Sequence, residues 1–239
     1  GNKDHSLAGN GLDASNRDDA INIQPWPVYG TPMPDAITSY RSKGKTWLIT
    51  ANEGDGREYI YETDEVTCID AGHEYDDGDC ISHLDEARIK DVTLDPVAFP
   101  DAVNLQMEEN LGRLKMLSTE GDIDNDGDYD EIHSFGARSI TIWDASGEWV
   151  YDSGDTMEQQ TALALPLDFN STNDENDSFD DRSDDKGPEP EGVVVGKVRG
   201  RQYAFVGLER VGGIMIFDVT DPAETSYVSY INNRDFSVT

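Results

Sequence analysis

Short apolar stretches alternate with turn residues in the C-terminal part of the chain. Val193–Val198, Gln202–Leu208 and Gly213–Val219 have strand length, and a weaker stretch, Tyr227–Ile231, follows them. The segments between them are rich in turn-forming residues: Arg199-Gly200, Arg210-Val211-Gly212 and Thr220-Asp221-Pro222. Four short strands within about 40 residues predict one four-stranded antiparallel blade of a β-propeller, over residues 190–236.

Weaker copies of this pattern lie earlier in the chain. Pro34–Ile37 resembles Pro190–Val193, and Thr46–Glu53 resembles Gln202–Glu209. Three further segments repeat the second, third and fourth strands: Tyr129–Gly136, Arg138–Asp144 and Glu148–Asp152. The repeats predict an all-β propeller domain or fragment over residues 1–239, with blades at 34–95, 112–160 and 190–236.

Three blades are too few for a ring, because a propeller closes with at least four. Either a fourth blade lies in the divergent stretches, or the chain belongs to a larger ring. Residues 1–33 are expected to supply an edge strand or loop from a preceding blade. Ala102–Leu111 has apolar spacings typical of a short helix, and Ala87–Leu94 alternates like a strand.

Acidic residues dominate the composition. Asp and Glu number 50 against 18 Lys and Arg, a net charge of −32, which excludes nucleic acid as an expected partner. Such a charge favours solubility in a salty medium, and local cation sites could explain part of it. The acidic run 169–186 predicts a solvated, mobile loop, and it contains the sequon Asn170-Ser171-Thr172. No apolar run approaches the ~20 residues of a membrane span.

The two cysteines, Cys68 and Cys80, flank an Asp- and Gly-rich loop. An isolated pair predicts a loop-closing disulfide formed in an oxidising compartment, worth roughly 3 kcal/mol. A metal site is the alternative, because His73 and His83 lie close in the sequence.

One segment, Asp122–Asp130, has the spacing of a calcium loop. Acidic residues occupy its first, third, fifth and ninth positions, and Gly127 permits a sharp bend at the sixth. His133 replaces the bidentate Glu of an EF-hand and the flanks are strand-like, so the sequence predicts an EF-like calcium loop between two strands. The alternative is an acidic hairpin turn. The expected calcium ligands are Asp122, Asp124, Asp126, Asp128 and Asp130.

A second constellation depends on position within the repeat. Glu53 and Glu209 end equivalent second strands, and Asp35 and Glu191 begin equivalent first strands. In a propeller, equivalent corners of the blades meet at one face of the channel. Three arginines accompany these corners: Arg57, Arg138 and Arg210. The residues therefore predict either a charged ring at the channel mouth that binds cations or anions, or an ion-pair network that fastens adjacent blades.

Six longer motifs resemble the choice-of-anchor I family of secreted or surface-anchored propellers: PDAITSY, TWLITANEGDGREY, GDIDNDGDYDEIHSFGARSITIWD, DDRSDDKGPEPEG, YAFVGLERVGGIMIFDVTDP and YINNRDF. Many members carry the description alkaline phosphatase-like, and relatives include animal mesenchyme-specific cell-surface glycoproteins. The resemblance implies a ring of about seven blades, of which this chain would be the later part. The remaining blades of the same protein are therefore an expected partner.

The resemblance also implies a phosphoester hydrolase, although no G-x-S-x-G or H-E-x-x-H motif is present. Activity would resemble that of calcium-dependent propeller phosphatases, in which channel carboxylates hold the metal. We expect the catalytic positions to be Glu53, Arg57, Arg138, Glu191, Glu209 and Arg210, within a wider set that includes Asp35, Asp55, Glu189, Arg234 and Asp235.

Two functions remain open from the sequence. One is a secreted, periplasmic or cell-surface calcium-dependent hydrolase that acts on a phosphoester. The other is a non-catalytic, calcium-stabilised surface binding or adhesion module. Several carboxylates around a shared, open metal position would indicate the enzyme, whereas closed sites would indicate the binding module.

Overall fold

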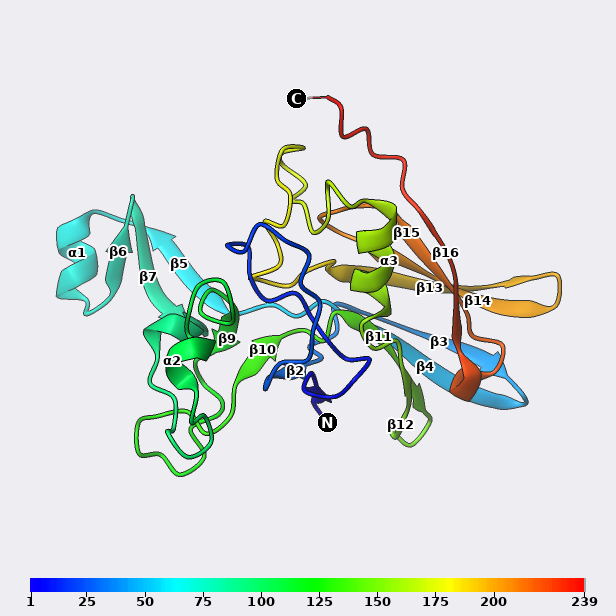
Figure 1. Ribbon diagram of the computed structural model, residues 1–239, viewed down its shortest axis with the longest axis horizontal. Coiled ribbons are helices and arrows are strands. Elements are labelled where there is room, and N and C mark those ends of the chain that lie inside the picture. Colours follow the sequence, from blue (N-terminus) through cyan, green and yellow to red (C-terminus); the bar gives the residue numbers. More distant parts are fainter. Residues whose placement is uncertain (239) are drawn as a thin grey trace.

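The computed structural model describes residues 1–238, which form four β-sheets with few and short helices. The chain is therefore all-β, as predicted. Two four-stranded sheets lie at one end of the molecule, and a three-stranded arm protrudes at the other (Figure 1). A five-stranded sheet lies between them. None of the helices within residues 1–238 has the length and apolar character needed to cross a bilayer.

The predicted C-terminal blade is a four-stranded antiparallel sheet in chain order. Its two central strands alternate buried and less buried residues, as expected where one sheet face covers a core. Arg199 and Gly200 form the two-residue turn of its first hairpin, both with positive φ (49° and 90°). The strands are β13 (Pro190–Val198), β14 (Arg201–Leu208), β15 (Ile214–Asp218) and β16 (Ser226–Ile231).

The strands predicted for the blades at 34–95 and 112–160 share one sheet, which corrects that division. Its order is β12-β11-β4-β3, and every neighbouring pair is antiparallel. Residues 53–138 are an insertion between its second and third strands, so the chain returns to the free edge of β4 far along the sequence. The strands are β3 (Ala36–Ser42), β4 (Lys45–Asn52), β11 (Ser139–Asp144) and β12 (Trp149–Asp152).

The two four-stranded sheets share one apolar core. Ile49 and Ile142 from the first sheet pack in the same cluster as Val206, Met215 and Phe217 from the second. Strand β13 lies against β3 and β4, so the first strands of the two sheets are neighbours. Two sheets within residues 1–238 do not close a ring, and the seven-bladed ring therefore stays a prediction.

Much of the insertion belongs to the five-stranded sheet, which also takes strands from the N-terminal segment. Its order is β1-β2-β10-β9-β8, with a parallel β2–β10 pair and a separate apolar core. N-terminal residues therefore pair within this chain, and β2 lies inside the sheet instead of at an edge. The strands are β1 (Lys3–Asp4), β2 (Tyr29–Thr31), β8 (Glu86–Arg88), β9 (Lys115–Leu117) and β10 (His133–Phe135).

The protruding arm contains the disulfide. Cys68 and Cys80 are bonded, which confirms the prediction and excludes a cysteine metal site. The bond joins the helix of the arm to its central strand. The arm consists of β5 (Glu58–Glu62), α1 (Glu65–Asp70), β6 (Glu74–Asp76) and β7 (Asp79–Leu84), with sheet order β5-β7-β6.

The remaining helices are short. The predicted helix at 102–111 is limited to α2 (Ala102–Leu105), and the predicted strand at 87–94 gives way to a 3-10 turn, η1 (Ile89–Asp91). A second 3-10 turn is η2 (Pro222–Glu224). Helix α3 (Thr156–Ala164) was not predicted, because the charged Glu158 occupies a buried position and leaves no clear apolar stripe.

The acidic run 169–186 is solvated only in its middle, where the exposed residues lie between 173 and 181, and both of its ends are buried, which corrects the prediction of a solvated loop. Asn170, Asp180, Ser183 and Asp184 are at most 3% exposed, and the segment lies between the two four-stranded sheets and the N-terminal segment (Figure 1). Asn170 of the sequon is fully buried, so the folded chain cannot present it for glycosylation.

Candidate functional site

Three glutamates meet where the two four-stranded sheets approach each other. Glu53 follows the last residue of β4, Glu209 follows the last residue of β14, and Glu189 precedes β13. Their carboxylate oxygens lie within 4.8 Å of one another. The repeat therefore placed Glu53 and Glu209 at corners that the structure brings together.

The backbone beside Glu53 requires glycine. Gly54 has a φ of 80°, and a Cβ there would lie 1.9 Å from the backbone nitrogen of Gly136. Gly136 has a φ of 69°, and a Cβ there would lie 1.8 Å from the carbonyl oxygen of Glu53. This close approach of two backbones turns the chain out of β4 and holds Glu53 at the corner.

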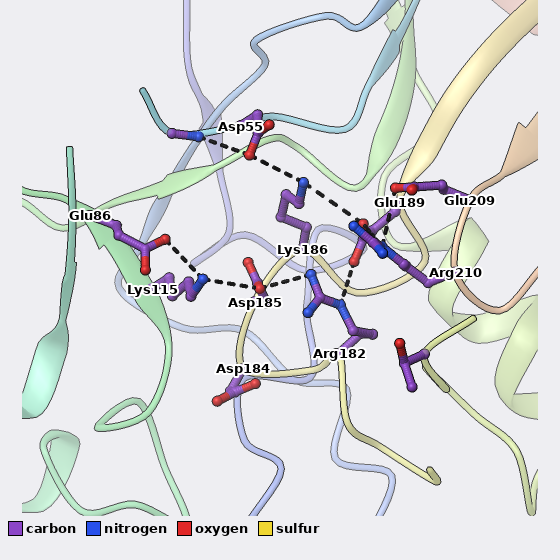
Figure 2. Close-up of polar contacts among 12 residues, drawn as sticks. Asp55, Glu86, Lys115, Arg182, Asp184, Asp185, Lys186, Glu189, Glu209 and Arg210 are labelled. Carbon is purple, nitrogen blue, oxygen red and sulfur yellow. Dashed lines mark hydrogen bonds and ion pairs between the residues drawn. The ribbon is translucent and has the colours of Figure 1, made fainter. Parts of the chain in front are cut away.

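Three cations of the chain itself lie against the three glutamates. Lys186 Nζ lies 2.8 Å from Glu53 Oε1. Arg182 Nε donates to Glu189 Oε1 at 2.7 Å (Figure 2). Arg210 Nε lies 3.1 Å from Glu189 Oε2 and 3.2 Å from Glu209 Oε2. Three carboxylates thus face three basic groups.

The ion pairs continue outward from the three glutamates through residues 169–186, which we call the acidic segment. Asp185 lies 2.8 Å from Arg182 Nη2 and 3.3 Å from Lys115 Nζ, and Lys115 also pairs with Glu86 at 2.9 Å (Figure 2). We use "charged centre" for the inner part of this network, without Lys115 and Glu86. Its members are Glu53, Arg182, Asp185, Lys186, Glu189, Glu209 and Arg210.

Burial and pairing shift the protonation of this set. Burial raises the pKa of Glu53, and the hydrogen bond from Lys186 only partly opposes that rise. Burial would also raise the pKa of Asp185, but the positive charges of Arg182 and Lys115 outweigh burial and lower it. Burial lowers the pKa of Lys186, yet its hydrogen bond to Glu53 leaves that pKa raised overall. Lys186 therefore stays charged and fixed to its partner.

Only three of the six expected catalytic residues belong to the charged centre: Glu53, Glu209 and Arg210. Arg57 turns away to Asp85, with its Nε 2.6 Å from Asp85 Oδ2, and Glu191 is exposed on β13. Arg138 is 4% exposed and is held by Glu158 and by the carbonyls of Asp13, Ser183 and Asp185. The six residues therefore do not converge on one site.

A small cavity opens beside the charged centre. Its volume is about 210 Å³, below the 300–1,000 Å³ that is typical of small-molecule sites. Four cations, Lys115, Arg182, Lys186 and Arg210, line it together with carboxylates and the ring of Phe135. Each of these cations already has a carboxylate partner.

The expected calcium loop joins β9 to its antiparallel neighbour β10, so its flanks are strands as predicted. Side-chain oxygens of Asp122, Asp124 and Asp130 lie within 4.8 Å of one another, and Asp128 and Asp130 form a second such group with Asp95. Gly127 bends the loop with a φ of 101°. Asp126 lies outside both groups and accepts a hydrogen bond from the Asp128 backbone.

Mutual repulsion perturbs the carboxylates of this loop. The charge of Asp126 is the main cause that raises the pKa of Asp124. Within residues 1–238, no basic side chain forms an ion pair with any of the five expected ligands, Asp122, Asp124, Asp126, Asp128 and Asp130. Oxygen ligands at this spacing fit Ca²⁺, which takes six to eight oxygens.

Sequence reasoning missed five members of the ion-pair chain: Glu86, Lys115, Arg182, Asp185 and Lys186. A signal was present, because Arg182 and Lys186 are the only basic residues in the otherwise acidic run. A basic residue at each of two points within dense acid is typical of a segment that neutralises itself on folding.

Comparison with known proteins gives two curated relatives. The chain is 28% identical over 230 residues to a mesenchyme-specific cell surface glycoprotein of Strongylocentrotus purpuratus, covering 87% of this chain and 28% of that protein. It is 36% identical over 119 residues to gigasin-3a of Magallana gigas, covering 48% of this chain and 42% of that protein. The chain thus spans less than half the length of either relative. No solved structure matches it.

The family assignment rests on a match over most of the chain. Residues 1–222 fit the choice-of-anchor I domain, and this range includes the Glu53 corner with its two glycines, the acidic loop 122–130 and the acidic segment 169–186. The phosphatase description that the resemblance implied receives no support from the curated relatives, whose names carry no such activity. This chain belongs to the choice-of-anchor I domain family.

Proposed function

We propose that this chain is a non-catalytic, calcium-stabilised binding module of a secreted or cell-surface protein. One observation carries the proposal: basic groups of the chain itself occupy the carboxylates where a catalytic metal would bind. Glu189 is fully buried between Arg182 and Arg210, and Lys186 holds Glu53. A metal ion would have to displace these cations. The charged centre therefore stabilises the contact between the two four-stranded sheets.

The proposed location follows from independent features. The Cys68–Cys80 disulfide is typical of proteins that fold in an oxidising compartment. One relative is a cell surface glycoprotein by its printed name. A surface or secreted location therefore fits both the chemistry of this chain and its family.

Calcium would act on the acidic loop. Its aspartates have no positive partner within residues 1–238, so a divalent cation would relieve their repulsion and fix the connection between β9 and β10. The loop lies at the surface, in the five-stranded sheet and away from the charged centre. This role is stabilising and requires no open ligand position.

The competing proposal is a metal-dependent phosphoester hydrolase, favoured by the 4.8 Å grouping of Glu53, Glu189 and Glu209. Turnover of p-nitrophenyl phosphate and bis-p-nitrophenyl phosphate separates the two. We expect no turnover above buffer with calcium, zinc or magnesium supplied in turn. Metal-dependent turnover that Glu53→Gln abolishes, with an unchanged melting temperature, would establish the enzyme instead.

A further inference from the structure

A second group of buried acidic and amide side chains lies on the N-terminal side of the charged centre. Asp13 comes from the N-terminal segment, and Asn170 and Asp180 come from the acidic segment. Asp13 and Asn170 are fully buried, and Asp180 is 3% exposed. These residues take no part in the ion pairs of the charged centre.

Hydrogen bonds through Ser183 and Arg138 connect the side chains of Asn170 and Asp180 to each other and to the backbone of Asp13. The Ser183 hydroxyl accepts from Asn170 Nδ2 at 2.9 Å and donates to Asp180 Oδ1, so these two side chains share a partner. Arg138 donates both to the Asp13 carbonyl at 2.7 Å and to the Ser183 carbonyl at 2.8 Å. The N-terminal segment and the acidic segment are thereby held together at this position.

Two oxygens at this point have no partner within residues 1–238. They are Asp180 Oδ2 and Asn170 Oδ1, on the two side chains that meet at Ser183. A buried carboxylate oxygen without a hydrogen bond destabilises the folded state unless a proton, a water or a cation satisfies it. The two oxygens therefore indicate a missing positive or donating group.

The nearby charges make the deficit larger. Both Glu158 oxygens are already used, one by Arg138 and one by the Asp13 backbone N–H. The charges of Asp13 and Asp180 repel each other, and the charge of Glu158 acts on both in the same sense. The half-buried Asp18 adds a further negative charge that acts on both.

We propose that Asp13, Asp180 and Asn170 bind a divalent cation, calcium, in the interior of the protein. The donors are two carboxylates and an amide oxygen, and hard oxygen ligands of this kind suit Ca²⁺. We assign the remaining ligands to the half-buried Asp18, whose charge acts on both carboxylates, and to water. The ion ties the N-terminal segment to the acidic segment, independently of the acidic loop.

Counting bound calcium tests the site directly. The surface loop is first disabled with Asp122→Asn and Asp124→Asn, and calcium per chain is measured by native mass spectrometry after equilibration with calcium chloride alone. We expect one ion to remain in this background. Adding Asp180→Asn should remove it, whereas the matched control Asp181→Asn, an exposed neighbour, should retain it.

The outcomes separate this site from the proposed role of the acidic loop. One ion in the wild type that Asp180→Asn removes would support the interior site and reject the loop. An ion count unchanged by Asp180→Asn would overturn the interior site, because a proton or a water must then satisfy the buried oxygens.

Hydrogen exchange keeps the test decisive if Asp180→Asn does not fold. In the Asp122→Asn/Asp124→Asn background, calcium should slow amide exchange at least tenfold in residues 11–22 and 169–185, relative to chelator. Exchange in these two segments that does not respond to calcium would overturn the proposal. The arm at 58–84 serves as the internal reference, since it is not expected to respond.

Discussion

The acidic loop 122–130 and the charged centre are both rich in carboxylates, yet they differ in what offsets the repulsion between those carboxylates. The aspartates of the loop are surface groups without basic partners among residues 1–238. The carboxylates of the charged centre are mostly buried and paired with Lys186, Arg182 and Arg210. The charged centre thus has its own cations, whereas for the loop we propose a cation from solution.

The difference shows that acidic density alone does not identify a metal site. Three carboxylates lie within 4.8 Å of one another in both regions. What distinguishes the regions is whether basic side chains reach the same oxygens. At the charged centre they do, because Arg182 and Lys186 lie within the folded acidic segment and Arg210 follows the adjacent strand end.

The largest expected effect is the loss of the buried arginine behind the charged centre. Arg138→Met would leave Glu158 buried without its partner and would release the Ser183 and Asp185 carbonyls. Breaking a buried pair costs about 3–5 kcal/mol, which corresponds to a fall of about 10 °C in melting temperature. Thermal unfolding followed by circular dichroism measures it.

The matched control is Arg41→Met, at an exposed position on β3. It should change the melting temperature by less than about 2 °C, since exposed charges contribute little. Equal effects of the two substitutions would mean that the buried Arg138–Glu158 pair does not stabilise the fold.

Calcium should produce the next largest effect, and the acidic loop should supply part of it. Binding to the folded state alone adds about 2.7 kcal/mol at a hundredfold excess over Kd, or about 5–10 °C. Asp124→Asn should reduce the calcium-induced rise, because Asp124 is one of three converging ligands. Glu209→Gln should leave the calcium-induced rise unchanged. A melting temperature that chelator does not alter, in protein shown to start calcium-loaded, would refute this role.

Acid should weaken the charged centre. The pKa of folded Asp185 lies below its ordinary value of 3.8, so its contribution to stability is fully present above that pH. That contribution is lost as the pH falls through the folded pKa. Asp185→Asn should therefore flatten the decline of stability below about pH 4, measured by urea unfolding at several pH values. The exposed Asp181→Asn is the control and should retain the full decline.

Local pattern predicted much of the fold. The strands of the C-terminal sheet, the flanks of the acidic loop and the disulfide follow from periodicity, turn residues and cysteine spacing. The meeting of Glu53 and Glu209 follows from the repeat. Each of these features depends on residues close in the sequence or on one internal copy.

The features of the fold that local pattern did not predict depend on contacts between residues far apart in the sequence. Strand β11 pairs with β4 across an insertion of more than 80 residues, and nothing local to Arg138–Asp144 specifies that partner. The acidic segment resembles a solvated loop because its burial requires cations and carbonyls from distant elements, such as Arg138 and Lys115. Helix α3 escapes detection for a similar reason, since its buried Glu158 is tolerated only beside Arg138.

The sign of one stability change tests most directly whether the charged centre is structural. Glu189→Gln keeps the shape of a fully buried side chain and removes the charge that Arg182 and Arg210 share. Catalytic carboxylate clusters are commonly held at a cost in stability, so neutralising one often stabilises the protein. For a structural centre, the melting temperature of Glu189→Gln should fall by about 5 °C, roughly 2 kcal/mol. A melting temperature that stays the same or rises would contradict the structural role.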